Sequence, residues 1–317
     1  MSASVMTVRG PVDPSTLGFG LPHEHLRVDL ISVFPASMLA FDFQLIDEEL
    51  MTDEVGLFQQ AVGSDWPGAP WIVDVTTDAR MGRDPAYLRR MSEQLDLHIV
   101  MGCGRYREPW YEPGFAERPT GQLADLFTQE IEQGVGDTGI RPGIIGELGA
   151  DREFVSPAEE RTLRAAAIAH QRTGLAITLH ARFGQVGLAQ LDILEDAGVR
   201  PERIIVGHTD TDPDLDYHEA IAKRGAWVQY DCIRGKIALV PERRIRYILE
   251  ARRRGFLSRV LLSHDVCALS MLRAYGGTGF DYLPGTFAGL LRDGGLSNEE
   301  LIQLFVLDPR QALTPGV

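Results

Sequence analysis

Two histidines separated by one residue, His23 and His25, stand near the end of the segment 18–26. Alternate side chains of a β-strand lie on the same side, so the two imidazoles would project together and Glu24 would point the other way. Two such imidazoles can bind one metal ion. A lone His-x-His pair also occurs on exposed strands, so it predicts a metal site only where further ligands converge on it.

Four further residues with metal-ligating side chains each end a short apolar run that is typical of a buried strand. They are Glu147, His180, His208 and Asp265. The carboxyl ends of parallel strands meet at the active-site mouth of an α/β barrel, so we expect all six side chains to line one pocket. The alternative is that individual side chains are held by loop carbonyls or cap the following helices.

Four imidazoles and two carboxylates are too many ligands for one tetrahedral ion and suit two divalent ions. Such ligands favour Zn²⁺, with Mn²⁺, Co²⁺ or Ni²⁺ as alternatives. We assign His23, His25 and Asp265 to the first ion, His180 and His208 to the second, and Glu147 to the bridge. A water shared by both ions becomes a bridging hydroxide, which is the expected nucleophile. Asp265 is the predicted catalytic residue, because it can pass the remaining proton to the leaving group.

Two further residues with possible ligand atoms lie close to Asp265 in the sequence. His264 must point away from the pocket if Asp265 points into it. Cys267 fits either a position in the pocket wall or the role of a small buried hydrophobe. Neither residue is included in the predicted ligand set.

The charge and the cysteine content of the chain limit the expected partners and the expected cellular compartment. The chain has 31 basic and 45 acidic residues, a net charge of −14, which opposes binding to nucleic acid or to an anionic membrane. Its three cysteines give no disulfide framework. The N-terminus lacks the pattern of a secretory signal, and no apolar run approaches the ~20 residues of a membrane span. These features predict a cytoplasmic protein that acts on a small molecule.

The order of apolar runs and helix signals predicts an α/β fold, a single (β/α)₈ TIM barrel domain spanning residues 1–317. Eight strands are expected, each followed by a helix. The expected strands lie at 18–26, 71–77, 98–104, 143–147, 176–180, 204–208, 226–230 and 260–265. One helix is marked at both ends, by Ser156 with Glu159 as a capping box and by Gly174 just past its end.

Four connections at the mouth are expected to set specificity, and their shapes do not follow from the sequence. They are 31–43, 105–119, 232–240 and 266–295. The run 33–41 is apolar and is costly to leave in water, so it predicts either a pocket wall or a contact between two copies in a homodimer.

The motifs at 18–26, 139–149, 207–210 and 261–265 occur in the order found in the phosphotriesterase family of the amidohydrolase superfamily, which the chain resembles over nearly its whole length. The resemblance implies a barrel with a binuclear metal centre. Where phosphotriesterase carries a carboxylated lysine as metal bridge, this chain has Gly146, and the neighbouring Glu147 takes that role. In this respect the chain is similar to the subgroup with a glutamate bridge. That subgroup includes phosphotriesterase homology proteins, lactonases of phosphorylated sugars and a mammalian protein associated with N-acyl amide hydrolysis.

The resemblance also suggests two substrate contacts. Sugar-phosphate lactonases of this group hold the phosphate with a lysine after strand seven, which Lys236 matches, and an arginine after strand eight. Ala268 and Leu269 stand where that arginine is expected, so we expect neutral or weakly polar substrates in preference to phosphorylated ones. Tyr106 matches a tyrosine found near the metals in related lactonases, although such a residue can also serve packing alone.

The predicted function is hydrolysis of a carboxylic ester, with a lactone as the first expectation. Amide hydrolysis of an N-acyl amino compound is the alternative, with phosphotriester cleavage as a side activity. A barrel that binds a ligand without turning it over is a third hypothesis. All six ligand positions hold competent residues, which argues against this third hypothesis.

Overall fold

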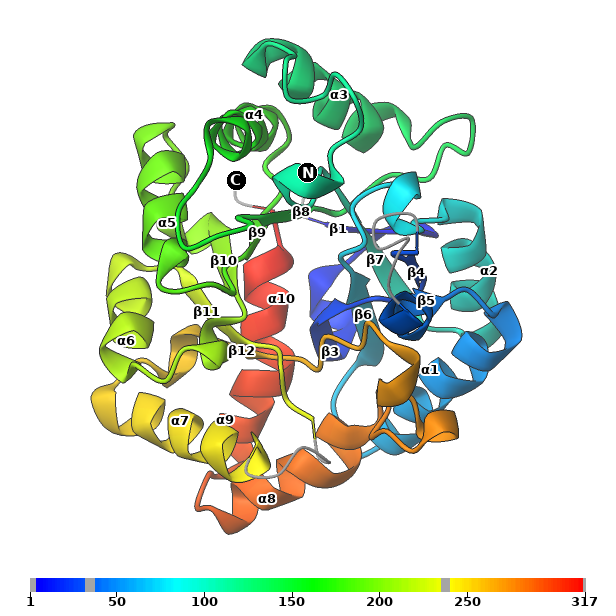
Figure 1. The fold of residues 1–317 in the computed structure, drawn as a ribbon. Helices are drawn as coiled ribbons and strands as arrows, with labels where there is room; N and C mark the ends of the chain where they lie inside the picture. Colours follow the sequence, from blue (N-terminus) through cyan, green and yellow to red (C-terminus); the bar gives the residue numbers. More distant parts are fainter. Residues whose placement is uncertain (1–3, 32–37, 235–239, 316–317) are drawn as a thin grey trace.

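A computed structural model describes residues 4–31, 38–234 and 240–315 of the chain. Its centre is a sheet of eight parallel strands arranged as a ring (Figure 1), and each strand pairs with the next one along the chain. In chain order the strands are β3 (Leu17–Glu24), β6 (Ala69–Asp74), β7 (His98–Cys103), β8 (Ile144–Gly149), β9 (Ile177–His180), β10 (Ile204–Gly207), β11 (Trp227–Tyr230) and β12 (Val260–Leu262). The predicted α/β barrel is confirmed.

The ring closes between β3 and the segment that follows β12. The backbone N–H of Asp265 donates to the His23 carbonyl, and that of His25 donates to the Val266 carbonyl, each at 3.3 Å. Glu24, which points away from its two histidine neighbours, accepts hydrogen bonds from this same segment. The first and last strands are thus joined at the residues that carry predicted ligands.

Helices cover the outer face of the ring. They are α1 (Glu48–Val62), α2 (Pro85–Leu95), α3 (Thr120–Gln133), α4 (Pro157–Thr173), α5 (Val186–Asp196), α6 (Leu215–Arg224), α7 (Val240–Arg254), α8 (Ala288–Asp293) and α9 (Asn298–Ile302). The last helix, α10 (Asp308–Leu313), lies across one end of the ring (Figure 1). Helix α4 starts with the predicted capping box of Ser156 and Glu159 and ends at Gly174 in the left-handed conformation.

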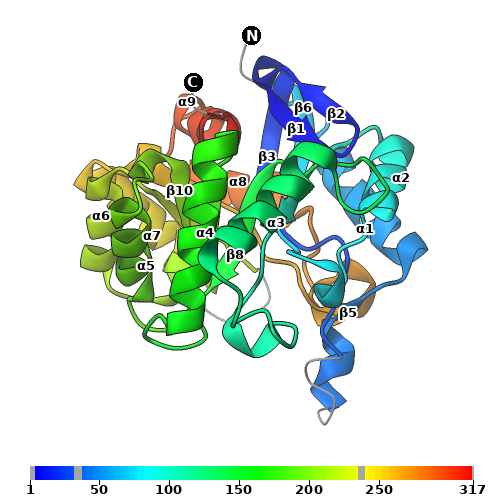
Figure 2. The ribbon, with the colours of Figure 1, turned by 90° about the horizontal axis from the view of Figure 1, so that it is seen from above.

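The two faces of the strands bury different apolar sets. Trp71, Val73, Val100 and Ile205 belong to a cluster inside the ring, whereas their strand neighbours belong to a larger cluster under the helices. Ala312 and Leu313 of α10 join the inner cluster and close that end of the barrel. In Figure 2 this end carries both termini and the hairpin of β1 (Val5–Thr7) and β2 (Gly10–Val12), opposite to the end at which β5 (Gln44–Leu45) lies.

Several predicted boundaries were wrong. Strand four continues past Glu147 to Gly149, while strands six and eight end at Gly207 and Leu262. His208 and Asp265 have positive φ angles of 57° and 54°, and an extended strand does not continue through that conformation.

The connections also differ from the prediction. The irregular segment after strand one contains a small hairpin of β4 (Val28–Asp29) and β5, and the long connection 266–295 contains α8. Most of the apolar run 33–41 and Lys236 lie outside the described residues. Of the helices in the described part of the chain, none has the length and apolar character needed to span a membrane.

Candidate metal centre

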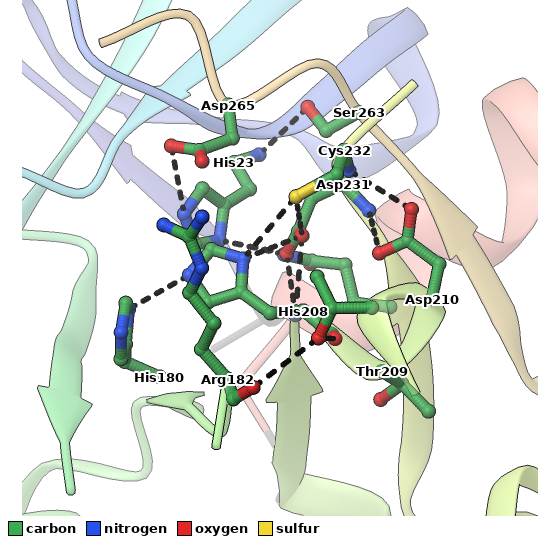
Figure 3. A network of polar contacts seen from close by, with 12 residues as sticks. His23, His180, Arg182, His208, Thr209, Asp210, Asp231, Cys232, Ser263 and Asp265 are labelled. Carbon is green, nitrogen blue, oxygen red and sulfur yellow. Dashed lines mark hydrogen bonds and ion pairs between the residues drawn. The ribbon is translucent and has the colours of Figure 1, made fainter. Parts of the chain in front are cut away.

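The structure brings all six predicted ligands together in one buried cluster at the carboxyl ends of the strands. Figure 3 shows His23, His180, His208 and Asp265 of this cluster. Among the described residues, five sets of three have ligand atoms within 4.8 Å of one another, and two of these sets consist of predicted ligands alone. One set is His23, His25 and Asp265, and the other is Glu147, His180 and His208. These sets correspond to the two ion positions assigned from the sequence.

Glu147 lies between the two sets. Its Oε2 atom is 3.0 Å from His180 Nδ1, 3.4 Å from His208 Nε2 and 3.6 Å from His23 Nε2. Its Oε1 atom is 3.6 Å from the Nε2 atom of His25. One carboxylate thus faces all four imidazoles, which is the position a bridging ligand requires.

In two of the histidines, a neighbour outside the ligand set holds the Nδ1 atom. The Thr76 hydroxyl donates to the Arg27 carbonyl, so it accepts the hydrogen bond from His25 Nδ1 at 2.9 Å. His208 Nδ1 donates to Asp231 Oδ1 at 2.7 Å. In both rings Nε2 is therefore the nitrogen that faces the cluster, as in many metal-ligating histidines.

A buried nitrogen in the cluster lacks a partner. His23 Nδ1 faces Asp231 Oδ2 at 3.3 Å, whereas His23 Nε2 is fully buried and has no hydrogen-bond partner among the described residues. A buried polar atom without a partner is costly, and a cation bound beside Glu147 and Asp265 would satisfy it. The residues present therefore fit a metal ion.

Burial and mutual contacts set the protonation of the cluster. Burial, and then the nearby His208, lower the pKa of His180 to about 4. Burial opposes ionisation of Glu147, but the facing His180 and His208 imidazoles hold its pKa well below the usual value. The cluster thus contains an ionised carboxylate beside a neutral imidazole, and both are the forms that bind metal.

His25 and His208 are exceptions. Burial opposes protonation of His208, but the facing Asp231 raises the pKa of that ring well above its usual value. His25 behaves in the same way. Burial disfavours its charged form, yet its hydrogen bond to Asp265 raises the pKa of His25 to about 9. Metal binding would therefore displace a proton from this ring, because only the neutral imidazole is a ligand.

The sequence analysis missed two charged residues that hold the ligands. Asp231 follows β11 directly and contacts both His208 and His23. Arg234 donates from one nitrogen to Asp265 Oδ2 and to the Asp265 carbonyl, each at 3.0 Å. Asp231 carried the signal used for the other ligands, a carboxylate at the end of a strand, whereas nothing in the sequence marked Arg234.

His264 and Cys267 also have defined positions. His264 Nδ1 donates to Glu24 Oε1 at 2.8 Å, and its Nε2 accepts from the backbone N–H of Leu283 at 3.1 Å. It therefore points away from the cluster, as predicted. Cys267 lies in the wall of the pocket described next.

A cavity of about 130 Å³ adjoins the cluster and includes Glu147 and Asp265 in its wall. Apolar side chains form much of the remainder: Val28, Leu30, Phe43, Met81 and Trp110. Tyr106 also lines it, with its hydroxyl 3.3 Å from His180 Nδ1. A small, partly apolar organic molecule would fit beside the cluster.

The sequence model of the phosphotriesterase family matches residues 3–313. The chain belongs to the phosphotriesterase family. It is 35% identical over 301 residues to the phosphotriesterase homology protein of Escherichia coli, covering 94% of this chain and 98% of that protein. It is also 30% identical to the N-acetyltaurine hydrolase of Dictyostelium discoideum, covering 86% of this chain and 75% of that protein.

Solved structures of family members have the same fold. The Escherichia coli phosphotriesterase homology protein, described with phosphate in its active site, matches with a TM-score of 0.86 and 33% identity, covering 95% and 99% of the two chains. A lactonase from Listeria monocytogenes matches with a TM-score of 0.88 and 26% identity, covering 99% and 100%. The predicted family is confirmed, and the chain is a hydrolase of this metal-dependent family.

Proposed function

We propose that this hydrolase cleaves carboxylic esters, specifically lactones, with two divalent cations, Zn²⁺ being the first expectation. The observation that carries the proposal is the pair of ligand sets joined at Glu147 beside a small cavity. The match to a lactonase along the whole length of both chains supports an ester as the substrate.

In the proposal, His23, His25 and Asp265 would hold one cation and His180 and His208 the other, with Glu147 placed between the two sets. Two divalent cations bound there would supply a hydroxide near neutral pH and polarise the carbonyl group of the substrate. The chain's own residues orient the ester and move the proton. Tyr106, whose hydroxyl lies beside His180, is the proposed contact for the carbonyl side of the substrate.

Asp265 is the proposed proton carrier. Burial opposes its ionisation, but the hydrogen bond from His25 and the nearby His208 keep its pKa below the usual value, and Arg234 holds Oδ2. A carboxylate held in this way binds a proton only transiently, so a proton taken from water at Oδ2 would pass readily to the leaving alkoxide. The ring C–O bond of the lactone breaks, and the product is a hydroxy acid.

Replacing Asp265 with Asn tests this role. Loss of proton transfer should lower kcat for γ-butyrolactone by a factor of about 10² to 10⁴. Metal content per chain, measured by elemental analysis, should equal that of the wild type, because the amide oxygen of the asparagine keeps a ligand in place. Wild-type turnover in this variant would reject the role, and a chain without metal after expression in Zn²⁺-supplemented medium would reject the centre.

Amide hydrolysis is the second candidate. It is supported by the 30% identity to an N-acetyltaurine hydrolase over most of this chain. The metal-centred chemistry is the same for both bonds, so a panel of lactones and N-acyl amino acids, compared by kcat/KM, separates the two candidates. A higher kcat/KM for every N-acyl compound than for every lactone would favour the amide.

A further inference from the structure

An arginine that forms no ion pair with a carboxylate of the described residues lies at the mouth of the cavity. Arg182 is exposed and follows β9, two residues after His180. His180 and Arg182 line the same cavity, whereas Ala181 between them is not part of its wall. The Arg182 side chain contributes to the cavity wall, and Figure 3 shows it extending from the end of its strand toward the imidazoles.

The guanidinium of Arg182 is free to bind. Its backbone carbonyl accepts a hydrogen bond from the Thr211 hydroxyl at 3.4 Å, but its side chain forms no ion pair with any described residue. The two internal segments that the structure does not describe, 32–37 and 235–239, contain no aspartate or glutamate. A carboxylate partner from those segments is thus excluded.

The other arginines near the cavity are already paired. Arg107 forms an ion pair with Asp151 at 3.1 Å and lies over the Trp110 ring at 4.2 Å. Arg234 is paired with Asp265 at 3.0 Å. Arg182 is therefore the arginine of the cavity wall that remains available for an anion from outside, as far as the described residues show.

We propose that Arg182 binds a carboxylate of the substrate, so that the preferred substrate is a small lactone that carries a carboxylate close to the ring. This inference rests on the proposed function and adds a substrate class to it. One guanidinium matches one carboxylate in a two-bond contact. The small cavity places that carboxylate near the cleaved bond.

A carboxylate fits better than a phosphate. A phosphate dianion is held firmly by paired cationic contacts, and the neighbouring arginines are already paired. Ala268 and Leu269 supply no charge after β12. The inference replaces the expectation of a neutral substrate with that of a singly charged one.

Two lactones that differ by one carboxylate test the inference. The probes are γ-butyrolactone and its γ-carboxylate, with the metal-loaded, full-length enzyme. In the wild type, kcat/KM should be about tenfold higher for the carboxylated lactone, which corresponds to one charge-assisted contact. Arg182→Gln should abolish this ratio and Arg182→Lys should retain part of it. The matched control Arg200→Gln, which removes an exposed arginine outside the cavity wall, should keep the wild-type ratio.

A binding measurement separates this inference from the proposed function. By calorimetry, glutarate should bind the wild type about tenfold more tightly than butyrate, and Arg182→Gln should lose this difference. If the enzyme cleaves neither lactone, the proposed function fails. The comparison of glutarate with butyrate then tests the role of Arg182 by itself. Equal affinities of the wild type for glutarate and butyrate would overturn the inference, and so would an unchanged affinity difference in Arg182→Gln. A substitution Arg182→Gln that weakens binding of inorganic phosphate more than binding of glutarate would also overturn it.

Discussion

The ring nitrogen that His208 offers to the cluster is set by a neighbour. Asp231 Oδ1 accepts from His208 Nδ1 at 2.7 Å, and Asp231 Oδ2 lies 3.3 Å from His23 Nδ1, so one carboxylate orients a histidine of each proposed ion position. Burial opposes its charged form, but the facing His208 and His23 keep the pKa of Asp231 below the usual value. An ionised Asp231 also increases the basicity of both rings.

Removing the charge of Asp231 should therefore weaken metal binding without removing a ligand. For Asp231→Asn we expect about a 10- to 100-fold loss of Zn²⁺ affinity, measured by competition with a chromogenic chelator. Asp212→Asn, at a half-buried residue outside the cluster, is the control. A Zn²⁺ affinity equal to that of the wild type would show that Asp231 has only a packing role.

The elements that the sequence predicted well are those with local signals. Helix α4 has the predicted capping box and ends at the predicted Gly174. Strand ends were less accurate, because the left-handed backbone of His208 and Asp265 depends on tertiary contacts. The ligand positions were found from residue type and strand order, whereas Arg234 required coordinates, since its role is defined by a contact with Asp265 across the mouth.

The C-terminal helices contain a buried carboxyl group with a pH-dependent effect. Asp308, the first residue of α10, accepts a hydrogen bond from Gln303, and its Oδ2 has no partner among the described residues. Burial raises the pKa of Asp308 from 3.8 to about 7. The folded state therefore holds this proton up to about pH 7, while the unfolded state releases it near pH 4.

This difference in pKa predicts the sign of a stability change. The contribution of Asp308 is fully present below pH 4 and falls as the pH rises to about 7, by up to about 4 kcal/mol. Asp308→Asn should remove this fall, so its unfolding free energy in urea should exceed that of the wild type more at pH 8 than at pH 5. Asp293→Asn, an exposed residue of α8, controls for the loss of one charge. The same difference at both pH values would contradict the prediction.

At the scale of the whole molecule, one residue takes part both in closure of the barrel and in assembly of the metal centre. Glu24 Oε1 accepts from Ser263 Oγ, from the backbone N–H of His264 and from His264 Nδ1, each at 2.8 Å. Its Oε2 accepts from the backbone N–H of Val266 at 2.9 Å. These bonds join the first strand, which carries His23 and His25, to the segment that carries Asp265.

Replacing Glu24 with Gln should affect stability and metal binding together. The amide offers one acceptor oxygen and places an N–H₂ group against a donor, so on the order of 3 kcal/mol should be lost from the unfolding free energy. Zn²⁺ affinity should fall with it. Glu54→Gln is the matched control, because Glu54 is also buried and accepts from the backbone N–H groups of Arg273 and Ala274, away from the cluster. Both variants should lower stability in urea, but only Glu24→Gln should lower Zn²⁺ affinity at temperatures where both are folded. Equal Zn²⁺ affinities in the two folded variants would separate closure of the barrel from assembly of the centre.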